Sequence, residues 1–212
     1  MKIIKPSVEI LTPFNCDYNG LDVLRRIEKC GRVCYKSEDK ITDDSAPKFV
    51  TNIIKRGHEA VLEHASITVK FTCDRGVSHE IVRHRLASYC QESTRYCNYS
   101  RDGFGNEITV IEPCYLDCGS DAYGLWYNAC QQAEYGYFAM LSCGCTPQEA
   151  RAVLPNSLKT EVVMTANLRE WRHFLKLRCA AAAHPQMREL AVQLLHRLKS
   201  EIPVVFDDIE EG

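Results

Sequence analysis

A short stretch, Arg83 to Arg95, holds the residues of this chain that are best suited to binding anions. It opens with Arg83-His84-Arg85 and, after seven intervening residues, ends with Ser93-Thr94-Arg95. Guanidinium groups bind phosphates and carboxylates through paired hydrogen bonds, and a loop hydroxyl with successive backbone N–H groups can hold a phosphate. The whole chain has a formal net charge of −2, so this local excess of arginine indicates a ligand pocket rather than a general polyanion surface.

Three other interpretations of this stretch stay open. Arg83 and Arg85 near a helix C-terminus would interact favourably with the helix dipole without binding any ligand. Ser93 or Cys90 with His84 would supply the nucleophile and base of a hydrolase, although the sequence has no GxSxG motif. Arginine and tyrosine alternate in TRYCNYSR, as in nucleic-acid-binding modules, but the net charge and the lack of an RNP or KH motif argue against a nucleic-acid partner.

The bulk composition fits one domain over residues 1–212, because 45% of the 212 residues are hydrophobic. No apolar run approaches the ~20 residues of a membrane span, and no signal sequence is recognisable, so we expect a cytoplasmic protein without a membrane partner. Twelve cysteines in such a protein are expected to be free, buried and inert. The spacings of Cys30/Cys34 and Cys114/Cys118 lack the tight CxxC form, and no metal site is predicted.

Hydrophobic periodicity predicts the elements that must position these residues. Helices are expected at residues 21–33, 47–56, 76–86, 125–141, 147–154, 168–178 and 185–200, and strands at 65–73, 108–111 and 159–165. The mixed order indicates the α+β class. On the helix at 76–86, Arg83 and Arg85 would point to nearly opposite faces and would meet different groups. The acidic tail, residues 207–212, is expected to be frayed.

The signature RHR, seven residues, then SxR resembles that of the flavin-dependent thymidylate synthases. The similarity extends upstream to Gly57-His58-Glu59 and Glu63-His64, and downstream through residues 151–155, 167–169 and 174–178. It covers most of the chain from Gly57 to Gln186. The resemblance implies a single α+β domain with a central, mostly antiparallel sheet and flanking helices, and a homotetramer whose active sites are built from several subunits.

The resemblance also implies the reaction. Such an enzyme transfers a methylene group from 5,10-methylenetetrahydrofolate to C5 of dUMP and reduces it to the methyl group of dTMP, with hydride from FAD that NADPH has reduced. The sequence has no GxGxxG motif, so the FAD phosphates must meet side chains instead of a glycine-rich cradle.

Site residues follow from the same resemblance, position by position. The catalytic residue would be Arg178, whose fixed positive charge next to the uracil ring favours ionisation at N3. His58 would lie near the flavin and the folate. Residues expected to bind FAD are Ala60, Arg83, His84, Arg85, Gln91, Asn167, Leu168, Arg169 and His173. Residues expected to bind dUMP are Glu80, Arg83, Gln91, Glu92, Ser93, Thr94, Arg95, Arg151 and Arg178.

The sequence departs from the family pattern at four of these positions. Glu80 stands where many relatives have Gln, Gln91 where others have Glu, Ala60 where some have a hydroxyl residue, and His173 where Asn is frequent. A carboxylate next to a phosphate would repel it. We therefore expect Glu80 to orient Arg83, three residues ahead on the helix, rather than to contact dUMP directly.

Overall fold

The computed structural model of the chain describes residues 1–15 and 18–212, which form two compact units. Unit 1 comprises Met1–Ser7, Phe71–Arg83 and Cys90–Val163, and unit 2 comprises Val8–Lys70, His84–Tyr89 and Met164–Gly212. Strands β3 (Ser66–Asp74) and β6 (Lys159–Asn167) each run through both units. A single domain over residues 1–212 stays a prediction.

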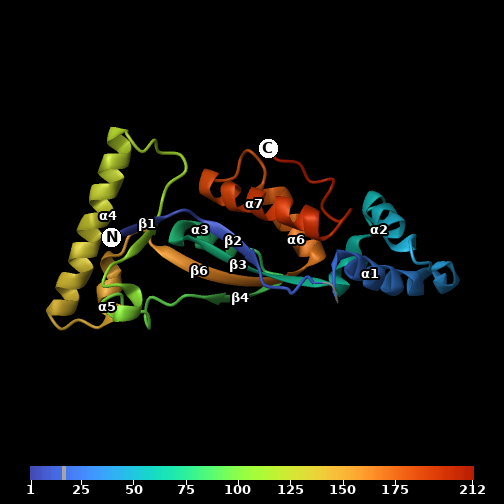
Figure 1. Cartoon of the computed structure of the whole chain (residues 1–212), viewed down its shortest axis with the longest axis horizontal. Helices are drawn as coiled ribbons and strands as arrows, with labels where there is room; N and C mark the ends of the chain where they lie inside the picture. Colours follow the sequence, from blue (N-terminus) through green and yellow to red (C-terminus); the bar gives the residue numbers. More distant parts are fainter. Residues whose placement is uncertain (16–17) are drawn as a thin grey trace. The chain divides into compact units, whose positions relative to one another are not determined.

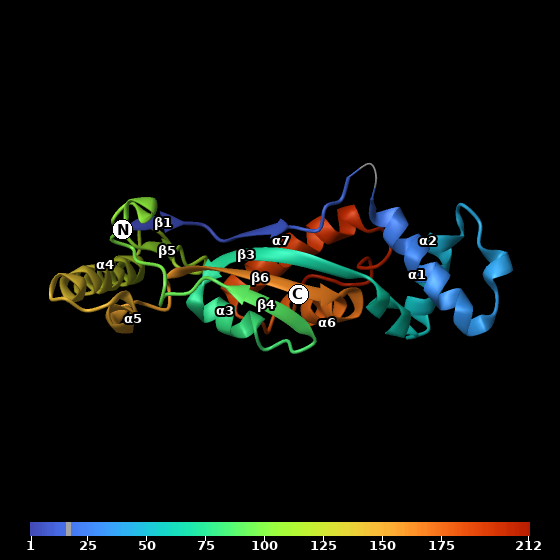
Figure 2. The same cartoon turned by 90° about the horizontal axis from the view of Figure 1, so that it is seen from below.

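The main sheet has four strands in the order β2 (Ser7–Ile10), β3, β6 and β4 (Ala87–Gln91), as Figures 1 and 2 show. Along β3 and β6, buried residues alternate with more exposed ones, which is the period of two expected for a strand with one face on a core. The sheet is antiparallel with flanking helices, so the α+β class is confirmed. A separate parallel pair joins β1 (Lys2–Ile4) to β5 (Thr109–Ile111).

Unit 1 contains the long helix α4 (Asp121–Ser142), followed by α5 (Pro147–Ala150) and the 3₁₀ turn η4 (Arg151–Val153). Figure 2 shows α4 and α5 side by side. The core of unit 1 contains Tyr99, Ile108, Val110, Tyr137 and Leu158, all of which are buried. The short helix α3 (Arg75–Ile81) follows β3 directly, and Asp74 caps its first turn by accepting a hydrogen bond from the N–H of Val77. The turn η3 (Asp102–Phe104) also belongs to this unit.

Unit 2 contains two helix pairs, each side by side in Figure 1: α1 (Gly20–Tyr35) with α2 (Ser45–Lys55), and α6 (Leu168–Arg178) with α7 (Pro185–Glu201). The 3₁₀ turns η1 (Glu38–Lys40) and η2 (Glu59–His64) lie before and after α2. Helix α1 buries Val23, Leu24 and Ile27 on one face and begins with a capping box between Asn19 and Asp22. No helix in the described part of the chain is long and apolar enough to cross a membrane.

These elements confirm most of the helices and strands predicted from periodicity, but the helix at 76–86 is wrong in its second half. Helix α3 ends at Ile81, and Arg83, His84 and Arg85 lie beyond it. The argument that the two arginines occupy opposite helix faces therefore fails. The physical reason is that the His84 side chain is buried, 5% exposed, and hydrogen-bonded, and these contacts outweigh the local helical preference of the sequence.

Two further expectations are corrected. Of the eleven cysteines that the structure describes, only Cys73, Cys130 and Cys179 are buried, while five are exposed; Cys16 lies outside the described residues. The acidic tail is packed rather than frayed. Phe206 and Ile209 are buried, and the N–H of Gly212 donates to the carbonyl of Cys179.

A buried guanidinium explains why the tail is ordered. Arg172 on α6 is 1% exposed and donates to both carboxylate oxygens of Asp208, at 2.6 and 2.8 Å, and to the carbonyl of Val205. It also contacts Glu59 of η2, at 3.1 and 3.2 Å. Because a buried charge is costly without partners, these carboxylates fix both the tail and η2 to α6.

We predict that Arg172→Met destabilises the protein by about 2–4 kcal/mol, since it leaves a buried carbonyl and two carboxylates without their donor. Lys176→Met is the matched control: Lys176 lies on the same helix and approaches the same Asp208, at 3.7 Å, but is half exposed. We expect it to cost less than about 1 kcal/mol. Urea unfolding of the three proteins measures both values, and equal losses would contradict the anchoring role of Arg172.

Candidate functional site

In unit 2, the buried His84 ring connects a carboxylate to an arginine. The Nε atom of Arg178 donates to Nε2 of His84 at 3.2 Å, and Nδ1 of His84 lies 3.2 Å from Oε1 of Glu170. A guanidinium can only donate, so Nε2 must be the unprotonated nitrogen and Nδ1 must carry the proton that Glu170 accepts. The neutral ring therefore orients Arg178 while Glu170 fixes its tautomer.

The surroundings of His84 keep its ring neutral. Its pKa lies below the usual 6.5, chiefly because burial disfavours the charged ring. The positive charge of Arg178 lowers the pKa further, and the hydrogen bond with Glu170 opposes the shift without reversing it. Donor atoms of His84, Glu170 and His173 lie within 4.8 Å of one another. Both nitrogens of His84 are already engaged, one of them by a cation, which makes this cluster unsuitable for a metal ion.

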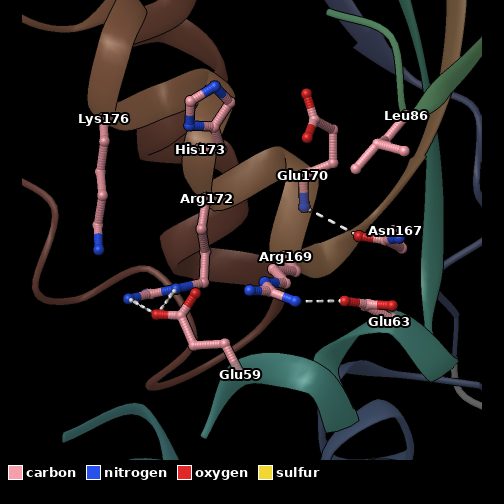
Figure 3. Close-up of a pocket in the computed structure, with 9 residues that line it drawn as sticks. All are labelled: Glu59, Glu63, Leu86, Asn167, Arg169, Glu170, Arg172, His173 and Lys176. Atoms are coloured by element: carbon pink, nitrogen blue, oxygen red, sulfur yellow. Dashed lines mark hydrogen bonds and ion pairs between the residues drawn. The ribbon is translucent and has the colours of Figure 1, made fainter. Parts of the chain in front are cut away.

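A pocket of about 460 Å³ opens beside this cluster at the N-terminus of α6 (Figure 3). Three residues expected to bind FAD line it, Asn167, Arg169 and His173. Asn167 caps the helix by accepting from the N–H of Glu170 at 2.9 Å, so the capped helix end and the Arg169 guanidinium adjoin the same space. Arg169 pairs with Glu63 at 2.6 Å, and both side chains are about half exposed. Such a pair is weak and can be exchanged for a ligand.

The other residues expected to bind FAD have different environments. The Leu168 side chain is fully buried, so only its backbone is available to a ligand, and Ala60 is exposed on η2. Arg83 and Arg85 are exposed, and their side chains make no hydrogen bond or ion pair with the residues that the structure describes. His58 is also exposed, and its Nδ1 lies 3.0 Å from the hydroxyl of Tyr35.

In unit 1, a smaller pocket of about 240 Å³ brings together Arg75, Thr94 and Arg151. Nη1 of Arg151 donates to the hydroxyl of Thr94 at 3.3 Å. Nη1 of Arg75 is buried and has no hydrogen-bond partner among the described residues. An unsatisfied buried guanidinium is costly, so this atom marks a position for an anionic oxygen.

Arg75 was not identified from the sequence. It lies eight residues before the RHR motif, immediately after β3, and no spacing rule connects it to Arg151. Its backbone N–H bonds the carbonyls of Asn156 and Leu158, at 3.0 and 3.1 Å, which brings the start of α3 to the segment that follows Arg151. Only this long-range contact brings Arg75 to the same pocket as Arg151.

The remaining residues expected to bind dUMP lie on β4 and in the turn after it. Gln91 donates to the hydroxyls of Ser78 and Thr160, at 3.0 and 3.4 Å, and Glu92 accepts from Lys159 at 2.9 Å. Both side chains are thus held by the protein itself. The Ser93 hydroxyl accepts from the N–H of Arg95, and the exposed Arg95 guanidinium lies 5.5 Å from the ring centre of Tyr96. Helix α3 ends before Arg83, so the role of Glu80 in orienting Arg83 stays a prediction.

In this arrangement His84 is not available as the general base that the hydrolase interpretation requires. A general base must offer a free nitrogen to the nucleophile. Both nitrogens of His84 are occupied, by Glu170 and Arg178. Neither Ser93 nor Cys90 therefore has the activating partner that this alternative requires.

Comparison with known proteins gives a consistent result. Residues 18–204 match the family model described as thymidylate synthase complementing protein. The chain is 35% identical over 188 residues to the flavin-dependent thymidylate synthase of Geobacter sulfurreducens, covering 85% of this chain and 79% of that protein. It is 34% identical over 216 residues to the enzyme of the same name from Mycobacterium avium, covering 93% and 83%.

Among solved structures, the chain is similar in fold to a UMP/dUMP methylase, PolB from Streptomyces cacaoi, bound with 5-Br dUMP. The TM-score is 0.77 with 23% identity, over 98% of this chain and 96% of that one.

The lowered pKa of His84 predicts an acid-dependent loss of stability. The unfolded chain binds a proton on this ring near pH 6.5, whereas the folded chain does so only at lower pH. Its contribution to stability is therefore complete above about pH 6.5 and falls, by up to about 1.4 kcal/mol per pH unit, as the pH drops toward the folded pKa.

His84→Asn should flatten this part of the stability curve, while His79→Asn, at an exposed histidine of α3, should keep the wild-type slope. Denaturant unfolding between pH 5 and 8 measures the slopes. An unchanged slope in the His84 variant would show that the ring titrates normally.

Proposed function

Because this chain belongs to the thymidylate synthase complementing protein family, whose model it matches over residues 18–204, we propose that it makes dTMP from dUMP. In this proposal methylenetetrahydrofolate donates the carbon, and NADPH reduces FAD. It is a flavin-dependent methyltransferase of that family. The observation that carries the proposal is that Thr94 of the family signature and residues of the downstream motifs line two pockets suited to anions, one in each unit.

The unit 1 pocket suits the phosphate of dUMP. Arg75 and Arg151 supply two guanidinium groups and Thr94 a hydroxyl, and the unpartnered Nη1 of Arg75 gains the acceptor that it lacks. Ser93 and Arg95 follow in the adjoining turn and would extend this set of donors. The position of Arg75 adds a residue to the dUMP site expected from the signature.

The unit 2 pocket suits FAD. Asn167, Arg169 and His173 line it, and the Arg169–Glu63 pair can be exchanged for a diphosphate because both partners are exposed. Arg85 belongs to the same unit and is a further cation without a partner among the described residues. When bound and reduced, FAD supplies the hydride that converts the transferred carbon to a methyl group.

Arg178 is the residue that we assign to catalysis. A guanidinium next to the uracil stabilises negative charge at N3 and O4 and so activates C5 as a nucleophile. Its Nε donates to Nε2 of the neutral His84, so a hydrogen bond from the buried ring orients the guanidinium. Glu170 acts through His84 and is a positioning residue.

A homotetramer in the cytoplasm completes the proposal. Helix α4 supports association, because only Cys130 and Tyr137 of its 22 residues are buried, while Leu125 and Tyr135 are each 72% exposed. Sedimentation of the purified protein measures the oligomeric state directly.

An anaerobic assay tests the function. Purified protein with FAD, NADPH, methylenetetrahydrofolate and dUMP should form dTMP, and omission of NADPH, methylenetetrahydrofolate or dUMP should abolish the reaction. The protein should also show the visible absorption bands of bound flavin. Failure to bind FAD or to form dTMP under these conditions would refute the proposal.

The dUMP site gives a sharper prediction. Arg75→Met should weaken dUMP binding roughly 10- to 150-fold, since one charge-assisted hydrogen bond is worth about 1.5–3 kcal/mol. Arg101→Met is the matched control, because Arg101 is exposed in the same unit and does not line the pocket. Calorimetric titration with dUMP measures both. Equal affinities of the two variants would remove Arg75 from the site.

A further inference from the structure

Unit 2 has a second cavity, of about 500 Å³, and His58 is the only one of its lining residues to which a role has been given above. It lies among the C-terminal half of α1, the segment around η1, and α2. Four basic side chains line it, Arg32, Lys40, Lys48 and Arg56, together with His58. No carboxylate of the described residues lines it; the acids nearest to Lys40 in sequence, Glu38, Asp39, Asp43 and Asp44, are exposed outside the lining. We call it the cationic pocket.

One of the four cations has a structural role. Arg32 donates to the buried Glu28 at 2.7 and 3.0 Å and lies 4.7 Å from the ring centre of Phe49. The second oxygen of Glu28 accepts from the hydroxyl of Ser45 at 2.7 Å. The charge of Glu28 is thus balanced by Arg32 and is not available to the other cations of the pocket.

Lys40, Lys48 and Arg56 are therefore uncompensated. Their side chains are exposed and make no hydrogen bond or ion pair with any residue that the structure describes. Three cations around one concave space raise the local concentration of anions, most of all of a ligand that carries several charges. The aromatic and imidazole rings of Tyr35, Phe49 and His58 also line the space and offer packing surface to a planar group.

The reactants of the proposed function restrict the ligand. The dUMP phosphate has its donors in unit 1, and FAD has its donors at the N-terminus of α6. The anionic groups left without a site are those of the two cosubstrates, the tail carboxylates of the folate and the phosphates of NADPH. Both cosubstrates combine anionic oxygens with a planar ring, which match the cations and the ring surfaces of the cationic pocket.

We propose that the cationic pocket binds the anionic end of a cosubstrate, away from its reacting atoms, through Lys40, Lys48 and Arg56. The inference rests on the proposed function for the identity of the reactants. It implies that these three residues set the affinity for that cosubstrate and leave the chemistry at the uracil ring unchanged.

The test is the triple variant Lys40→Gln, Lys48→Gln, Arg56→Gln. The control is Arg26→Gln, Lys29→Gln, Lys55→Gln, which removes the same charge from exposed positions on α1 and α2 outside the pocket. Binding is measured by calorimetry at low salt with pteroyltriglutamate, pteroylmonoglutamate and NADP⁺, and KM is measured for the matching cosubstrates.

We expect the triple variant, and not the control, to bind one cosubstrate roughly tenfold more weakly and to show a roughly tenfold higher KM for it, with kcat retained. A loss for the triglutamate that is larger than for the monoglutamate identifies the folate tail as the ligand. A loss confined to NADP⁺ and NADPH identifies the phosphates.

Three results would overturn the inference: affinities and KM values within twofold of wild type, equal losses in the control, or a loss confined to dUMP or FAD. Each is distinct from failure of the proposed function, in which the wild-type protein itself forms no dTMP.

Discussion

The buried charged side chains of helix α6 must be neutralised or hydrogen-bonded, and the rest of unit 2 depends on this constraint. This helix packs Leu168, Trp171 and Phe174 into the core and carries Arg172 and Glu170 into the same buried environment. Each buried charge needs a partner from another segment. Arg172 takes Glu59 from η2 and Asp208 from the tail, and Glu170 takes His84 from the segment after α3. Three segments far apart in sequence are therefore fixed by one helix.

The same constraint positions Arg178. A neutral imidazole lies between Arg178 and the charge of Glu170, so two consecutive hydrogen bonds through His84 orient the arginine. Burial of His84 is what keeps the imidazole neutral, because it lowers the pKa of the ring. The helix end at Ile81, which periodicity failed to predict, is thus part of the device that holds Arg178.

Local patterns in the sequence were sufficient to predict a helix or strand where the segment buries a regular stripe of apolar residues. Helix α6 was predicted with its observed bounds, and α1, α2, α7 and β3 within a few residues, because their apolar residues recur with the period of the element. Strands β1, β2 and β4 were not predicted, since each has at most five residues, too few for a period to show, whereas the equally short β5 was predicted as the strand at 108–111. The tail and the end of α3 depend on Arg172 and His84, whose partners are more than 30 residues away. For the same reason the signature located Thr94 and Arg151 but could not reveal Arg75.

The distribution of carboxylates reconciles a net charge of −2 with several sites for anions. Glu28 pairs with Arg32, and Glu92 pairs with Lys159. Glu59 and Asp208 both pair with Arg172. The fold must fix the position of each of these cations. An acid paired in this way contributes little field beyond its partner. The cations that have no partner in the described part of the chain, among them Arg83, Arg85, Lys40, Lys48 and Arg56, then act on ligands without a paired acid. Net charge is a poor guide to ligand preference in this chain because pairing, and not abundance, decides which charges a ligand meets.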